Sequence, residues 1–246
     1  MKSSTTKQLL LLASLPSLLW LFAGCDGLIG FSGITGSGKL VTKQFELTGF
    51  SGVDAGSAFQ VELSQGERFG VTVTADDNLV EDLEVAVSGH QLHLGLKPNV
   101  NVRNATLKAV ITMPALAGLH LSGAATTTVA GFNSSRPLDV ELSGASTLRG
   151  EIRAGDARFD VSGASSVELH GSAANVRCRA SGASHADLEQ FRCNDATVES
   201  SGASSVTLNA SGKLELEANG ASSVRYLGQP ANVEARTSGA SSIKKG

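Results

Sequence analysis

Apolar and polar residues alternate through most of the chain, and the alternation is clearest around a repeated Ser-Gly-Ala-Ser motif. Leu142 and Val140 stand shortly before one copy of the motif and are separated by an acidic residue. After the next copy, Val167 and Leu169 flank Glu168 in the same way. Strict alternation is typical of a β-strand with one buried face. Each motif is therefore predicted to join two strands at a tight corner, because Gly and Ala let backbones approach closely.

The motif recurs seven times at nearly constant intervals. Its glycines are separated by 21, 19, 19, 20, 18 and 19 residues and are Gly123, Gly144, Gly163, Gly182, Gly202, Gly220 and Gly239. Nineteen residues at about 3.3 Å each close a coil of roughly 60 Å, which leaves no room for a crossover helix. Coils stacked about 4.8 Å apart would bury their apolar faces against one another. We therefore predict an all-β fold, a parallel β-helix (β-solenoid) with coils of about 19 residues and regular repeats over residues 118–246. An antiparallel sandwich would instead favour Asn-Gly or Asp-Gly turns, whereas the corner here is typically Ser-Gly-Ala.

Stacking would align the serine two positions after each repeat glycine into a column along the solenoid. These serines share the inward parity of the apolar residues and are Ser146, Ser165, Ser184, Ser204, Ser222 and Ser241. We expect their hydroxyls to hydrogen-bond along the column or to the backbone, and the alternative is a row of ligand-binding serines. The outward residues beside each glycine form a flat strip poor in charge, which fits either a contact surface or close packing at the corner.

Residues 43–117 are less regular. Short alternating runs predict six strands, at 45–47, 59–63, 71–74, 84–87, 91–94 and 108–112. Residues 76–83 predict a helical turn with Asp76 or Asp77 as its cap. Because this part runs without a break into the repeats, we expect irregular β-coils on the same stack.

The first 24 residues are typical of an export signal. Lys2 and Lys7 precede an apolar run over 9–22, which is too short to cross a bilayer comfortably. The run ends in Leu-Phe-Ala-Gly-Cys and so resembles the lipobox of bacterial lipoprotein precursors, which predicts acylation of Cys25. The alternative is an ordinary secretory signal. The Gly-rich residues 25–42 are expected to form a tether. We expect an exported protein anchored by lipid in the bacterial cell envelope, on the periplasmic face or the cell surface.

Net charge and the absence of known motifs argue against several classes of binding site and active site. The net charge of −3 argues against a nucleic-acid surface. No cofactor motif is present, and the spacing of the five histidines predicts no metal site.

Cys178 and Cys193 are either a disulfide or two separate thiols, and the thiols are favoured because the pair is about five positions out of register. The aspartates that a β-helix enzyme could use form no column in the repeat frame, which indicates a solvated surface; they are Asp139, Asp156, Asp160, Asp187 and Asp195.

Several segments resemble the head-GIN-domain family of auto-transporter adhesins over about residues 43–243. They are Phe-Ser-Gly-Val at 50–53, Val-Thr-Val-Thr-Ala at 71–75, Gly-His-Gln-Leu at 89–92, Val-Ile-Thr-Met-Pro-Ala-Leu at 110–116, and the repeats. The resemblance implies a right-handed parallel β-helix over residues 43–246 and defines no catalytic residues. A non-enzymatic binding or structural module is therefore expected, with a protein or glycan partner. The alternative is a carbohydrate-active β-helix enzyme, a polysaccharide lyase or hydrolase. The terminal Lys244 and Lys245 oppose end-to-end association, so a monomer or a weak self-associator is expected.

Overall fold

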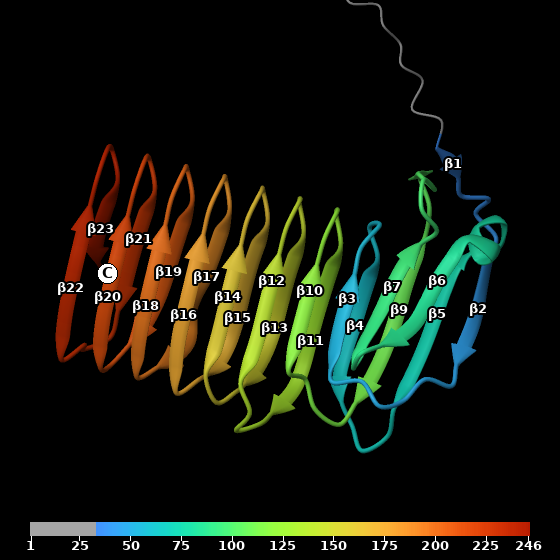
Figure 1. The fold of residues 1–246 in the computed structure, drawn as a ribbon, viewed down its shortest axis with the longest axis horizontal. Coiled ribbons are helices and arrows are strands. Elements are labelled where there is room, and N and C mark those ends of the chain that lie inside the picture. The colour runs from blue at the N-terminus through green and yellow to red at the C-terminus, as the bar shows by residue number, and fades with distance from the viewer. Residues whose placement is uncertain (1–32) are drawn as a thin grey trace, which may run out of the picture. The chain divides into compact units, whose positions relative to one another are not determined.

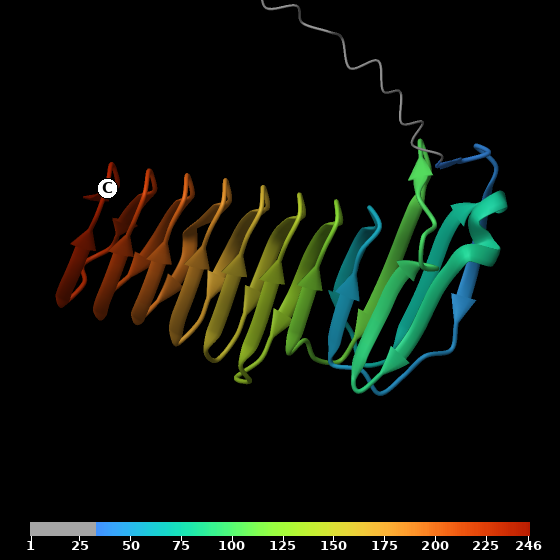
Figure 2. The same ribbon diagram turned by 45° about the horizontal axis from the view of Figure 1, so that its top comes forward.

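Each regular coil contributes one strand to each of two parallel sheets. The computed structural model describes residues 33–246, which form one compact unit. Sheet 1 contains the strands that precede the repeat corners: β10 (Gly118–Leu121), β12 (Leu138–Leu142), β14 (Ala157–Val161), β16 (Asn175–Ala180), β18 (Asp195–Ser200), β20 (Lys213–Ala218) and β22 (Asn232–Thr237). Sheet 2 contains the strands that follow them: β11 (Thr126–Asn133), β13 (Thr147–Arg153), β15 (Ser166–Ser172), β17 (His185–Cys193), β19 (Ser205–Ala210), β21 (Ser223–Leu227) and β23 (Ser242–Lys245). Figure 1 shows the corners aligned along one edge, and Figure 2 shows the even spacing of the coils.

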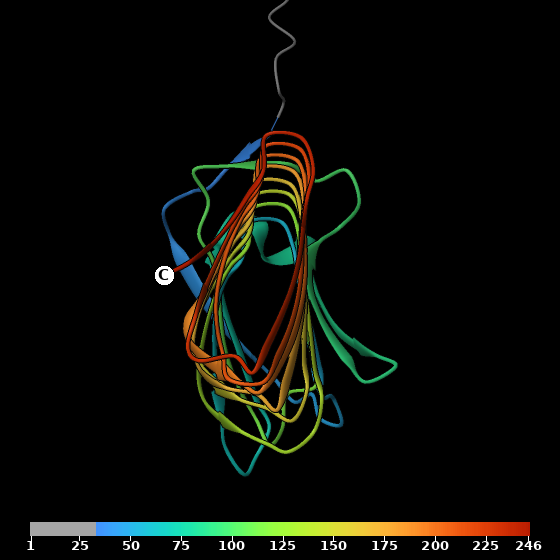
Figure 3. The same cartoon turned by 90° about the vertical axis from the view of Figure 1, so that its left-hand side faces the viewer.

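The register follows the predicted repeat. Val140 pairs with Phe159 and Phe159 with Cys178, each step being one coil of 19 residues. All three side chains are buried, and so are their apolar neighbours of the same parity. Between the sheets, Phe191 meets Phe159 edge to face with the ring centroids 5.8 Å apart. The prediction of a parallel β-solenoid with coils of about 19 residues is therefore confirmed, and the coils superpose when seen end-on (Figure 3).

The corners need glycine for two separate reasons. All seven repeat glycines have positive φ, between 67° and 75°, which side chains rarely tolerate. In addition, a Cβ built on Gly182 would lie 2.7 Å from the carbonyl oxygen of Gly163 in the preceding coil. That approach is held by the Ala183 amide, which donates to the same oxygen at 2.8 Å. The glycines thus set how closely neighbouring coils stack.

The aligned serines point into the corner. Five of them, from Ser146 to Ser222, are no more than 2% exposed, and Ser241 in the last coil is half-buried. Most of their contacts are with backbone carbonyls: Ser204 Oγ lies 3.1 Å from Ala180 O and 2.7 Å from Ser201 O, for example. These bonds satisfy the hydroxyls inside the fold, so the buried serines act in architecture.

The N-terminal part adds a coil out of sequence order and an antiparallel cap. β3 (Gly52–Ala55) and β4 (Gln60–Gln65) come first in the chain, but they lie between the regular coils and the coil of β7 (Gln91–Leu96) and β9 (Leu107–Met113). Three strands then close the stack by antiparallel pairing: β2 (Leu40–Phe45), β5 (Gly70–Asp76) and β6 (Leu83–Ser88). The 3₁₀ helix η1 (Asp77–Asp82) joins β5 to β6, and the β6–β7 hairpin projects from the coil outline (Figure 3). Residues 43–117 thus lie on the same stack, as expected, but their antiparallel strands were not expected.

Two predictions near the N-terminus need correction. The tether predicted to extend to residue 42 already contains strand structure, because β1 (Ile34–Thr35) pairs with β8 (Val102–Arg103) and β2 begins at Leu40. In addition, the strand predicted over 45–47 is β2, and it ends at Phe45. Asp76 precedes η1, but its side chain does not cap the helix. Asp76 is instead buried and accepts hydrogen bonds from the amides of Gly38 and Thr106, both at 2.7 Å. It therefore fixes the N-terminal segment to the domain, a contact between distant residues that local pattern does not reveal.

Candidate functional site

One row of ionisable side chains crosses the outer face of sheet 1 from β7 to β22. It occupies the position three residues before each repeat glycine and extends in register into the N-terminal coils. We call it the charged ladder; in spatial order its members are His93, Asp54, His120, Glu141, Asp160, Arg179, Glu199, Glu217 and Arg236. Neighbouring members are one strand spacing apart, about 4.8 Å. The ladder therefore presents a regular series of hydrogen-bonding groups along the solenoid axis.

Several of the ladder side chains are held by local ion pairs. Arg179 donates through Nε and Nη2 to the two oxygens of Glu199, at 3.0 and 3.3 Å. At the other end of the ladder, His93 Nδ1 lies 3.0 Å from Asp54 Oδ2. Arg158 lies two residues before Asp160 on β14, and its Nε and Nη2 both donate to Asp160 Oδ2, at 2.8 and 2.6 Å. The forked Arg179–Glu199 contact orients both groups.

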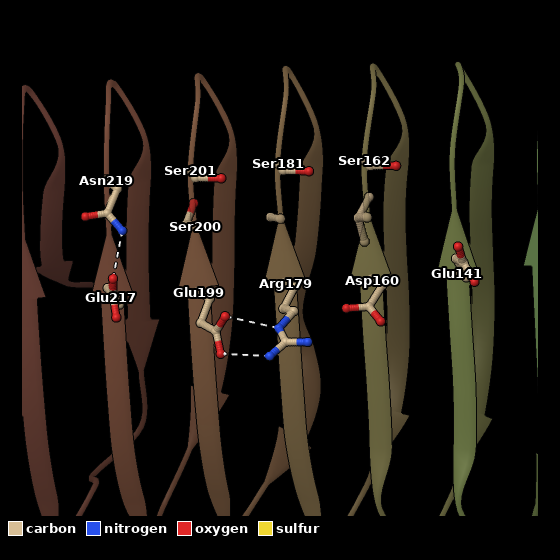
Figure 4. A pocket seen from close by; sticks show the side chains of 12 residues that line it. Glu141, Asp160, Ser162, Arg179, Ser181, Glu199, Ser200, Ser201, Glu217 and Asn219 are labelled. Atoms are coloured by element: carbon tan, nitrogen blue, oxygen red, sulfur yellow. Dashed lines mark hydrogen bonds and ion pairs between the residues drawn. The ribbon is translucent and has the colours of Figure 1, made fainter.

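A shallow groove of about 460 Å³ runs beside the ladder between Glu141 and Asn219. We call it the ladder groove. Its other side is formed by the polar residue directly before each repeat glycine, namely Ser162, Ser181, Ser201 and Asn219. Figure 4 shows these side chains in one line above the charged groups, with Asn219 joined to Glu217 by a 2.8 Å hydrogen bond. None of the groove residues is aromatic, so a ligand would be held by hydrogen bonds and charge.

A second charged row lies beside the ladder on the side away from the corners. It contains Asp139, Arg158, Arg177, Thr197, Glu215 and Glu234 in register. A second hollow of about 420 Å³ opens over Arg158 and Arg177. The outer face of sheet 1 is thus hollowed on both sides of the ladder.

Basic neighbours lower the pKa of two acids on this face. The hydrogen bond from Arg179, together with its charge, lowers the pKa of Glu199 despite partial burial. Lys213 lowers the pKa of Glu215 in the same way, with its Nζ 2.6 Å from Oε1. A general acid working near neutral pH needs the opposite shift. These two carboxylates are therefore suited to accept hydrogen bonds from a ligand.

The aspartates considered from the sequence are only partly brought together. Asp160 belongs to the ladder and Asp139 to the row beside it, so these two aspartates share no column, as predicted. Asp156 and Asp195 lie where strands of sheet 1 begin, at the end opposite the corners, and each accepts a hydrogen bond there. Asp187 is on sheet 2. The ladder was missed because aspartates were considered alone. Its signal was in the sequence, since His, Glu, Asp or Arg stands three residues before every repeat glycine.

The cysteines and histidines form no reactive centre in the described region. Cys178 and Cys193 are free thiols, and burial raises the pKa of each to about 12. Within residues 33–246, no three His, Cys, Asp or Glu side chains gather closely enough to hold a metal ion, and no helix is long and apolar enough to cross a membrane. The predicted signal segment and Cys25 lie outside the described residues.

Comparison with known proteins places the chain in a family. Residues 49–230 match the family described as "Putative auto-transporter adhesin, head GIN domain", whereas no curated protein matches. The crystal structure of a "putative adhesin" from Bacteroides fragilis has a TM-score of 0.80 at 25% identity, covering 87% of this chain and 100% of the other. Two structures from Parabacteroides distasonis, described as a "putative adhesin" and a "putative lipid binding protein", both have a TM-score of 0.68, at 18% and 15% identity, and cover 87% of this chain and 99% of theirs. These two show the shared fold alone. The chain thus belongs to this head-GIN-domain family.

Proposed function

We propose that this protein is a non-catalytic binding module of the bacterial cell envelope that holds a glycan chain in the ladder groove. Export by the N-terminal signal and acylation of Cys25 would attach it to a membrane. The adhesin-like family supports an envelope role, and the B. fragilis relative shares the fold over its entire length.

The observation that carries the proposal is the repeat of the ladder groove. A hydroxyl or amide group and an ionisable side chain recur there at the rise of one coil, about 4.8 Å. An extended polypeptide presents same-side groups about every 6.6 to 6.8 Å and would fall out of step. A pyranose ring is about as long as one coil rise, so successive sugars of a linear glycan can meet equivalent partners in successive coils. The expected affinity is modest at each coil and increases with glycan length.

A non-catalytic role fits the state of the acids. Glu199 is tied to Arg179 and Asp160 to Arg158, so both carboxylates are oriented by cations. Glycoside hydrolysis pairs an ionised carboxylate with a protonated carboxylic acid. The lowered pKa of Glu199 opposes the second of these roles.

Filling the groove tests the binding site. Ser181 is exposed in the middle of the groove, and a Ser181→Trp variant would block it without removing a buried group. The control is Ser223→Trp, an exposed serine just after a corner on sheet 2. The full-length protein in mild detergent would be applied to an array of bacterial glycans. We expect at least one glycan class to be bound by the wild type and the control but not by Ser181→Trp. Absence of any glycan binding, equal binding by both variants or shortening of the bound glycan would contradict the proposal.

The anchor is tested separately. Cells labelled with an alkyne fatty acid should incorporate the label into the wild-type protein and not into a Cys25→Ser variant, which should leave the membrane fraction. Equal labelling and equal membrane retention of the two would reject acylation at Cys25.

A further inference from the structure

The opposite face of the solenoid carries a separate hollow on sheet 2, which the ladder groove does not explain. It encloses about 660 Å³ at the ends of the sheet 2 strands β13, β15, β17 and β19. The pairing register shifts on both sides of β17, between Glu168 and Gly171 and between Leu188 and Arg192. The extra residues of β17 let Phe191 turn into the core while Gln190 stands outward. Such a bulge re-aims side chains locally and here forms one wall of the hollow.

Two arginines flank a serine across the hollow. Arg153, Ser172 and Arg192 lie opposite one another in register on β13, β15 and β17. Two strand spacings separate the arginines, so their Cα atoms are about 10 Å apart with the serine hydroxyl between them. Both arginines are exposed and Ser172 is half-buried, so their donors can converge on a group placed over Ser172.

These guanidinium groups are available for a ligand, unlike that of Arg179 in the charged ladder. Within residues 33–246, Arg192 forms no ion pair. Arg153 has one carboxylate neighbour, with Nη2 3.6 Å from Glu151 Oε1, which is too long for a direct hydrogen bond. By contrast, Arg179 on sheet 1 is engaged by Glu199 at 3.0 Å.

The remaining acid in the hollow is already neutralised. Glu189 Oε2 accepts a hydrogen bond from Arg225 Nη2 at 2.6 Å, and the Glu189 carbonyl accepts one from the Asn209 side chain at 3.1 Å. With Glu189 and Arg225 cancelling, Arg153, Arg192 and Glu151 leave a charge of +1. A single negative charge therefore complements the hollow better than a dianion.

We propose that this hollow binds one acidic sugar residue, with its carboxylate or sulfate ester held between Arg153 and Arg192 over the Ser172 hydroxyl. Guanidinium groups recognise both a planar carboxylate and a tetrahedral sulfate ester through paired hydrogen bonds. Outward polar side chains at the rim, Gln190 among them, provide partners for sugar hydroxyls. The site lies on sheet 2, so it does not depend on the function proposed for sheet 1.

The test measures binding of three acidic oligosaccharides to the full-length protein by isothermal titration calorimetry. The probes are trigalacturonate, a hyaluronan tetrasaccharide and a chondroitin 4-sulfate tetrasaccharide, with maltotriose as the neutral reference. We expect saturable binding of at least one acidic probe, at least tenfold stronger than that of maltotriose. Chondroitin 4-sulfate carries a sulfate ester in addition to uronate carboxylates, whereas hyaluronan carries the carboxylates alone, so stronger binding of the sulfated probe than of hyaluronan would assign the preference to sulfate. No binding by any acidic probe, or equal binding of maltotriose, would overturn the proposal.

Variants locate the site and separate it from the ladder groove. Arg153→Gln and Arg192→Gln should each weaken binding at least tenfold, and Arg192→Lys should have a smaller effect because it keeps the charge. Arg149→Gln is the matched control, since this sheet 2 arginine lies outside the hollow and pairs with Glu168. Ser181→Trp on sheet 1 should leave binding unchanged. Full affinity in both glutamine variants, or loss of binding in Ser181→Trp alone, would refute a site on this face.

Discussion

Replacing one repeat glycine should destabilise the solenoid through the contact between coils. In Gly182→Ala, the new methyl would meet the Gly163 backbone, with its oxygen 2.7 Å and its nitrogen 3.2 Å away. Backbone atoms cannot rotate aside as a side chain can. Relief would require moving the coils apart, which stretches the 2.8 Å hydrogen bond from the Ala183 amide to Gly163 O.

The magnitude has two parts that a matched control separates. Holding alanine at the φ of +75° costs about 1 to 2 kcal/mol, and overpacking against fixed backbone adds about 1 to 3 kcal/mol. Gly131 has nearly the same φ, +78°, but a Cβ there meets nothing within 4 Å. Gly131→Ala should therefore cost only the first part, and Gly182→Ala about 2 to 5 kcal/mol in total.

Urea denaturation followed by far-UV circular dichroism measures this difference. Each variant should be compared with the wild type at equal protein concentration, using the midpoint and the slope of the transition. Gly182→Ala should unfold at a clearly lower midpoint than Gly131→Ala. Equal midpoints would show that the conformation alone requires glycine, and the close stacking of corners would then not be a determinant of stability.

Three further outcomes follow from buried or paired groups. Asp76→Ala removes a buried acceptor of two backbone amides, so the free energy of unfolding should fall by about 2 to 3 kcal/mol, and limited proteolysis should newly cleave within residues 33–39. Cys178 and Cys193 should resist thiol alkylation in the native protein at pH 8, because that pH lies about four units below their pKa of about 12. Rapid alkylation of either cysteine in the folded protein, detected by mass spectrometry, would contradict this. Because Arg179 lowers the pKa of Glu199, their contact stabilises the fold above the ordinary pKa of 4.5 and is lost as the pH falls through the lower folded value. Arg179→Gln should raise that pKa toward 4.5 in an NMR titration, and an unchanged titration would disprove the pairing.

The regular half of the fold could be predicted from the sequence because its signals are local and repeated. Parity around each glycine identifies the buried residues, and the spacing of about 19 residues fixes which residues lie opposite one another in neighbouring coils. Val140, Phe159 and Cys178 could thus be aligned without any structure. The sequence shows that glycine recurs at each corner, and the structure adds the reason, a positive φ at each of these glycines.

The N-terminal half could not be predicted to the same extent, because no repeat fixes its register there. Alternation identified β4, β5, β6, β7 and β9, but not that β5 and β6 pair antiparallel or that the β3–β4 coil is inserted between later ones. The role of Asp76 depends on residues 38 and 30 positions away in the chain. Pairings of this kind are set by tertiary packing and not by local propensity.

The candidate site falls between these cases. The charged ladder could have been found from the sequence by reading every ionisable type at one repeat position. The sheet 2 hollow could not, because the bulge that aims Arg192 arises from the need to bury Phe191. A side chain re-aimed by a bulge breaks the parity on which the sequence interpretation rests.

The most direct test of the proposed function is to observe the ladder groove while a glycan binds. NMR would follow the Arg179 Nε–H signal and the Asn219 side-chain amide, both in the groove, during titration with a glycan selected on the array. The Nε–H signal of Arg149 on sheet 2 serves as an internal reference. Saturable shifts at Arg179 and Asn219 with an unchanged Arg149 are expected. Saturable binding that leaves both groove signals unmoved would show that the glycan binds elsewhere and would contradict the central claim.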